Sequence, residues 1–73
     1  MPKKFRTLKP KEIIAIICAN GFELRRTKGS HHIFTNSDKT HRVTVPVHSG
    51  RDILPDTLRS IIRQSGLSEG LFQ

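Results

Sequence analysis

A doubled histidine beside a cluster of basic residues is the part of this sequence best suited to chemistry. His31 and His32 directly follow a Gly-Ser pair, and three basic residues stand just upstream: Arg25, Arg26 and Lys28. An imidazole titrates near neutral pH, so a histidine can accept a proton from a ribose 2′-hydroxyl or donate one to a leaving oxygen. Lysine and arginine can hold the phosphate and offset the charge that develops on it. The cluster therefore predicts phosphodiester chemistry, and a surface histidine without a catalytic role is the simpler alternative.

The other candidate ligands in the sequence support different chemistries poorly. Asp52 and Asp56 are four residues apart, but they straddle an expected helix start and lack a third carboxylate for a magnesium site. Cys18 is the only cysteine, and with four scattered histidines it makes a poor zinc set. His41, beside a turn, and His48, before the second helix, are expected to be structural. We therefore expect no metal ion and no small-molecule cofactor.

The charge of the chain indicates a polyanionic partner. Its 73 residues contain 13 Lys and Arg against 6 Asp and Glu, which gives a net charge of +7. This charge favours a nucleic acid or an acidic protein as the partner, and not a membrane. The longest apolar run, residues 13–19, is too short for a transmembrane helix, and no secretory signal is recognisable. A single thiol, which allows no internal disulfide, favours the reducing cytoplasm.

Proline and glycine mark two expected helices. Pro10 stands at a first helical position, and the isoleucines that follow it fall at helical spacing up to residue 19. Cys18 and Ala19 are expected to pack with them. A second helix is expected to begin at Pro55 and to end before Gly66.

Alternating apolar and polar residues predict three strands between the helices, over residues 22–26, 31–35 and 42–48. Pro46 cannot donate to a ladder, so the third strand should be an edge. The expected fold is α+β, in the order α-β-β-β-α, with two helices on one face of a three-stranded antiparallel sheet. Double-stranded-RNA-binding domains share this layout. We expect one domain over residues 1–73, with a basic tip at 1–9 and a tail at 68–73 in which Leu71 and Phe72 tuck against the core.

The two histidines should point to opposite faces of the sheet, because side chains alternate along a strand. Phe34 is the largest apolar residue of the second strand, so we expect it under the helices. That assignment turns His32 inward or toward the rim and His31 outward. Ile33 also favours burial, which leaves the opposite assignment open.

Three motifs in this chain resemble the HicA family, also called YcfA-like. They are KGSHHIF at residues 28–34, RVTVPVH at 42–48 and TLRSIIRQSGL at 57–67. The resemblance extends over nearly the whole chain, from residue 9 to residue 72. It implies the toxin of a bacterial or archaeal toxin-antitoxin pair, a small RNase with the double-stranded-RNA-binding fold that cuts mRNA without a required metal. It also implies a HicB antitoxin that binds the toxin and blocks it.

The resemblance assigns the catalytic histidine to the family's G-S-H turn, which falls on His31 in this sequence. Members with G-S-x-H would assign it to His32, so His31 is the first choice and His32 the second. The residues expected to contact RNA are Lys28, Arg25, Arg26, Gly29 and Ser30. The main alternative is a non-catalytic RNA-binding module with the same basic face. A protein-interaction domain that docks an acidic partner is the third possibility.

Overall fold

Proline starts both long helices of the protein, as the sequence predicts. Pro10 is the first residue of α1 (Pro10–Ala19), and Pro55 is the first residue of α2 (Pro55–Ser65). Gly66 ends α2 with a φ of 69°, a left-handed conformation that glycine adopts without a Cβ clash. Both helix boundaries expected from proline and glycine are therefore confirmed.

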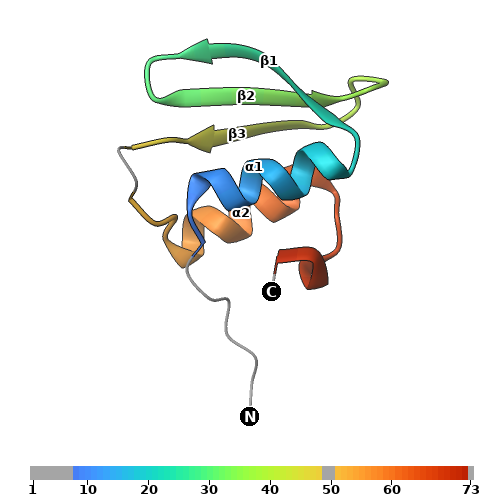
Figure 1. Ribbon diagram of the computed structural model, residues 1–73. Coiled ribbons are helices and arrows are strands. Elements are labelled where there is room, and N and C mark those ends of the chain that lie inside the picture. The colour runs from blue at the N-terminus through green and yellow to red at the C-terminus, as the bar shows by residue number, and fades with distance from the viewer. Residues whose placement is uncertain (1–7, 49–50, 73) are drawn as a thin grey trace.

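Three antiparallel strands lie between the helices in the spatial order β1-β2-β3, and both helices cover one face of this sheet (Figure 1). The remaining elements are β1 (Phe22–Lys28), β2 (His31–Asn36), β3 (Arg42–Pro46) and the 3₁₀ turn η1 (Glu69–Phe72). This arrangement confirms the predicted α+β fold. β3 is an edge strand, as Pro46 indicates, and the Gln64 side chain on α2 accepts a hydrogen bond from its Thr44 N–H at 3.0 Å. That bond satisfies part of the otherwise open strand edge.

The computed structural model describes residues 8–48 and 51–72 of the chain. An aliphatic and phenylalanine core fills the space between the sheet and the helices, with these buried side chains: Leu8, Ile13, Ile17, Phe22, Phe34, Val43, Val45, Ile53, Leu58, Ile61, Ile62 and Phe72. No helix in the described ranges combines the length and apolar character that a membrane crossing needs.

Leu8 and Phe72, from the expected tip and tail, are part of the core, whereas residues 1–7 of the tip lie outside the described residues. Leu8 is fully buried, and its carbonyl accepts a hydrogen bond from the Ile53 N–H at 2.7 Å. Phe72 is also fully buried, as expected, whereas Leu71 is 44% exposed, so the expectation for Leu71 was wrong. Four residues of a 3₁₀ turn cannot direct both neighbouring side chains inward.

The expectation that Cys18 and Ala19 pack with the isoleucines was wrong. Cys18 and Ala19 are exposed, because the core side of α1 at this level is already filled by Ile13 and Ile17. In β1 only Phe22 is buried, and Leu24 is 51% exposed. The buried residues of the sheet otherwise lie in β2 and β3, so most of β1 extends beyond the helices.

Candidate functional site

A two-residue turn connects β1 to β2 directly before the doubled histidine. The structure extends β1 to Lys28, so Gly29 and Ser30 alone form the turn, and Lys28 pairs directly with His31. Gly29 has a φ of 60°, which a residue with a side chain adopts only with strain. The Ser30 carbonyl accepts a hydrogen bond from the Val47 N–H at 2.6 Å. The turn is therefore tied to the end of β3 as well as to the two strands it joins.

His31 lies on the open face of the sheet. Phe34 is only 2% exposed and lies on the helix-covered face, so the alternation of side chains along β2 turns Ile33 and His31 the other way. His31 is exposed and stands between two cross-strand neighbours, Lys28 of β1 and Pro46 of β3. The predicted outward orientation of His31 is confirmed.

A β-bulge in β1 decides which basic residues share that open face. The pairing of β1 with β2 shifts between Leu24 and Arg26, so that Arg26 pairs with Ile33. Without this extra residue, alternation from Phe22 would turn Arg26 and Lys28 toward the helix side. The bulge instead brings both cations to the face of His31. The sequence of β1 does not predict this bulge, because an extra residue in one strand does not change the residue pattern of that strand in a recognisable way.

Arg25, the residue at the bulge, also reaches the open face. Its Nε donates a hydrogen bond at 2.7 Å to the Thr35 hydroxyl, which stands on that face in β2. A guanidinium nitrogen of Arg25 lies 3.6 Å from the Glu23 carboxylate, which offsets part of its charge. Among the described residues, Arg26 and Lys28 have no such ion pair. Four of the expected site residues thus share the open face: His31, Lys28, Arg26 and Arg25.

His32 occupies the opposite face at the same end of the sheet. It pairs with Thr27 of β1 and Val45 of β3, and its side chain is half-buried. Its Nδ1 atom is buried and has no hydrogen-bond partner among the described residues. An unpartnered buried nitrogen costs free energy, so its presence calls for a role or a missing partner. His32 is the second histidine that the sequence singled out, and this feature distinguishes it.

A hollow of about 300 Å³ lies at the junction of β3 and α2. Pro46, the cross-strand neighbour of His31, forms one wall, and the remaining lining residues are His48, Arg51, Asp52, Ile53, Leu54 and Thr57. His48 was expected to order the loop into the second helix. Its carbonyl does accept a hydrogen bond from the Arg51 N–H at 2.6 Å, and its side chain is exposed at the hollow.

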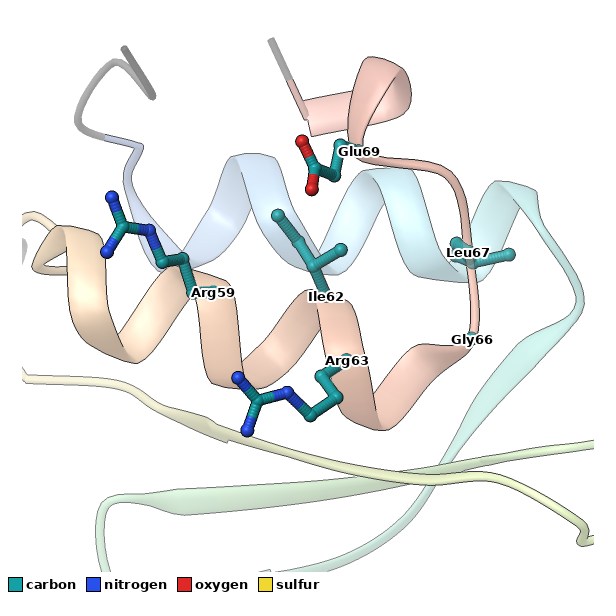
Figure 2. A pocket seen from close by; sticks show the side chains of 6 residues that line it. All are labelled: Arg59, Ile62, Arg63, Gly66, Leu67 and Glu69. Carbon is teal, nitrogen blue, oxygen red and sulfur yellow. The ribbon is translucent and has the colours of Figure 1, made fainter.

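A second hollow, of about 400 Å³, lies between α2 and the C-terminal turn (Figure 2). Its walls carry Arg59 and Arg63, but also the carboxylate of Glu69. Arg59 is further occupied by Asp56, whose carboxylate lies 3.6 Å from its guanidinium. None of the histidines lines this hollow, which therefore offers no imidazole for acid–base chemistry.

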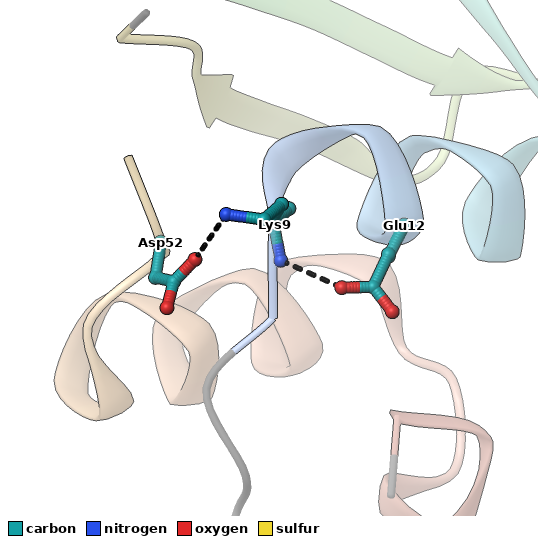
Figure 3. A network of polar contacts seen from close by, with 3 residues as sticks. All are labelled: Lys9, Glu12 and Asp52. Carbon is teal, nitrogen blue, oxygen red and sulfur yellow. Dashed lines mark hydrogen bonds and ion pairs between the residues drawn. The ribbon is translucent and has the colours of Figure 1, made fainter. Parts of the chain in front are cut away.

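The carboxylates considered for a magnesium site each face a different cation. Asp52 lies 2.9 Å from Lys9 Nζ, and the backbone N–H of Lys9 donates to the Glu12 carboxylate at 3.0 Å (Figure 3). Asp56 pairs with Arg59 on the next turn of α2. Within residues 8–48 and 51–72, no group of three His, Cys, Asp or Glu side chains is arranged to hold a metal ion.

The fold is that of a small α+β domain with an exposed basic face on its sheet. Residues 10–67 match the family described as "HicA toxin of bacterial toxin-antitoxin". The match covers most of the chain, so this protein belongs to the HicA toxin family, and the resemblance noted in its motifs is confirmed. Membership makes it a toxin of a toxin-antitoxin system and implies pairing with a HicB-type antitoxin. No curated protein matches the sequence.

Proposed function

We propose that this toxin is an endoribonuclease that cleaves mRNA in the cytoplasm with a histidine as general acid–base. The observation that supports it most is the position of His31, exposed on the open sheet face directly across from Lys28. Arg26 and Arg25 share that face. An RNA backbone can reach all four side chains without any rearrangement of the core.

The proposed reaction needs no metal ion. The His31 imidazole accepts the proton of a ribose 2′-hydroxyl, and the 2′-oxygen attacks the adjacent phosphorus. The bond from phosphorus to the 5′-oxygen breaks, and that oxygen takes a proton from water or from the imidazolium. The products are a 2′,3′-cyclic phosphate and a 5′-hydroxyl. Lys28 and Arg26 stabilise the extra negative charge on the phosphate oxygens in the transition state.

His32 is the second candidate for the acid–base role, and one observation favours it. Its buried Nδ1 has no partner among the described residues, so its tautomer is not held by a neighbouring group. Substrate contacts could supply that partner, which is how many catalytic histidines are oriented. If His32 acts, RNA must approach along the exposed part of β1 beside Thr27, and not across the open face.

The two histidines can be separated by matched substitutions. We expect His31→Ala to lower RNA cleavage about 10²–10⁴-fold and to abolish growth inhibition when the toxin is expressed alone. His32→Ala should leave cleavage largely intact. Circular-dichroism melts must show that both variants fold, and the exposed His31 substitution should shift stability by about 0.5 kcal/mol or less. Full activity in His31→Ala together with loss in His32→Ala would transfer the role to His32.

Chelation tests the proposed metal-free chemistry. Cleavage should proceed unchanged in EDTA, because histidine, lysine and arginine perform every step proposed for the reaction. Loss of cleavage in EDTA that added magnesium restores would contradict the histidine mechanism.

A non-catalytic RNA-binding module is the alternative function, since the same face and charge would serve it. Both functions would weaken with salt, because both neutralise phosphates. Only the enzyme releases fragments that end in a cyclic phosphate. Intact RNA after incubation with the folded wild-type protein would therefore favour the binding module.

The HicB-type antitoxin is proposed to inhibit by covering His31 and bringing negative charge to the open face. Such complementarity speeds encounter and sets the register of the complex. The complex should melt at a higher temperature than the free toxin, because the antitoxin binds the native state. Its association rate should fall steeply as salt is added. A complex that leaves His31 open to solvent would contradict inhibition by occlusion.

A further inference from the structure

We propose that the hollow at the junction of β3 and α2 is a second phosphate-binding subsite, in which His48 and Arg51 hold the RNA backbone next to the cleaved bond. This inference rests on the proposed RNA substrate and adds residues that the proposed reaction does not use. It assigns a binding role to His48, which the sequence indicated only as a structural residue.

Pro46 connects the subsite to the proposed reaction centre. It is the cross-strand neighbour of His31 on the open face, and it also lines the hollow. Neighbouring strands are about 4.8 Å apart, so the hollow begins one strand beyond His31. A strand of RNA that lies over His31 and crosses the edge of the sheet would enter it directly.

The charge of the hollow favours an anion. The side chains of Arg51 and His48 are exposed, and within the described residues neither forms a hydrogen bond or ion pair. Asp52 is the only acidic residue among the described residues of the lining, and its carboxylate is held by Lys9 Nζ at 2.9 Å (Figure 3). Because that ion pair neutralises Asp52, Arg51 leaves the hollow with a net positive charge.

The shape and the remaining walls suit a nucleotide. A volume of about 300 Å³ lies at the lower end of the range for small-molecule sites. Leu54 is 68% exposed at the rim, a large apolar side chain on which a base or ribose can pack. The hollow in Figure 2 lacks this character, because Glu69 stands among its arginines.

The test is direct binding of an RNA that cannot be cleaved. The probe is a fluorescent single-stranded 12-mer with 2′-O-methyl riboses throughout, titrated into the full chain at several salt concentrations. Arg51→Ala should weaken binding and reduce the slope of log affinity against log salt by about 0.7, the value for one single-stranded phosphate contact. Arg51→Lys should retain the slope, and His48→Gln should weaken binding.

Arg63→Ala is the matched control, an exposed arginine of the same region of the chain that lines the other hollow. It should change neither the affinity nor the slope. Equal effects of Arg51→Ala and Arg63→Ala would overturn the subsite. If wild type cleaves unmodified RNA and this equality is observed, the proposed function stands without the subsite. If Arg51→Ala weakens binding but wild type cleaves no RNA, the subsite stands and the enzyme assignment fails.

Discussion

Both ends of the sheet carry histidines, but the surroundings of these histidines differ. At the turn end, residues 29–32, His31 is exposed among cations, and the buried Nδ1 of His32 has no partner within residues 8–48 and 51–72. At the loop end, residues 36–41, the Nδ1 atom of His41 lies 3.3 Å from the Asn36 amide and 3.1 Å from the Thr40 hydroxyl. The side chains of Asn36, Thr40 and His41 are all within hydrogen-bond distance of one another. These contacts hold the imidazole of His41 in one orientation.

Close packing against α2 completes the contrast. A Cβ atom added to Gly66 would lie 2.6 Å from His41 Nε2, whereas one added to Gly29 would meet no atom within 4 Å. His41 is exposed, as His31 is, so exposure does not separate the two. The hydrogen bonds and the close approach to Gly66 do, since the His31 side chain has no hydrogen bond within the part of the chain that the structure describes. This difference makes His31 the better candidate for chemistry.

The largest expected effect is on cleavage, in a comparison of His31→Ala with His41→Ala. His31→Ala should lower RNA cleavage about 10²–10⁴-fold with little change in stability. His41→Ala should leave cleavage unchanged and lower the free energy of unfolding by about 1 kcal/mol, because it removes hydrogen bonds in the loop. Cleavage assays and urea melts on both variants check that one substitution lowers cleavage and the other lowers stability. A loss of cleavage in the folded His41→Ala protein would break the contrast between the two ends.

Glycine substitutions test the difference in packing. Gly66→Ala should destabilise the fold by about 2–4 kcal/mol, since it combines a positive φ with the clash against His41. Gly29→Ala has the positive φ alone and should cost about 1 kcal/mol. The double variant Gly66→Ala with His41→Ala should recover part of the loss. Equal melting temperatures for the two single variants would show that the His41 contact has no energetic weight.

Lysine substitutions test the difference in charge. Lys28→Ala at the turn end should reduce the salt dependence of RNA binding by about 0.7 in slope, as one lost phosphate contact does. Lys39→Ala at the loop end should leave the slope unchanged, although both residues carry the same charge. Two equal reductions would mean that RNA contacts the whole sheet and not one end of it.

The smallest expected effect concerns Asp38 in the loop. The Thr40 side chain donates a hydrogen bond to its carboxylate at 2.9 Å and lowers the pKa of Asp38 below its ordinary value. A carboxyl whose pKa is lower in the folded state stabilises the protein above the unfolded pKa, and this stabilisation is lost as the pH falls through the folded pKa. Thr40→Val should raise the pKa of Asp38, as measured by NMR titration, and reduce the acid sensitivity of the melting temperature. An unchanged Asp38 titration would contradict the role of Thr40.

The residue types of the sequence determined the helix boundaries and the alternation of side chains along the strands. Pro10, Pro55 and Gly66 bound the helices because they act through their own backbone, whatever surrounds them. Alternation along β2 places His31 and His32 on opposite faces, since it depends on one strand alone. The burial of Phe34 under the helices then decides that His31 is the outward one. The sequence also predicted the order of the elements and, through its motifs, the family.

Only the tertiary structure decided which groups meet at the site. The bulge that brings Arg26 and Lys28 to the face of His31 is a relation between two strands, and β1 by itself does not encode it. The hollow beside Pro46 exists because β3 and the start of α2 are packed together, with Lys9 from before α1 neutralising Asp52. Such contacts join residues far apart in the chain. They depend on how whole elements pack, which no local pattern of residue types can specify.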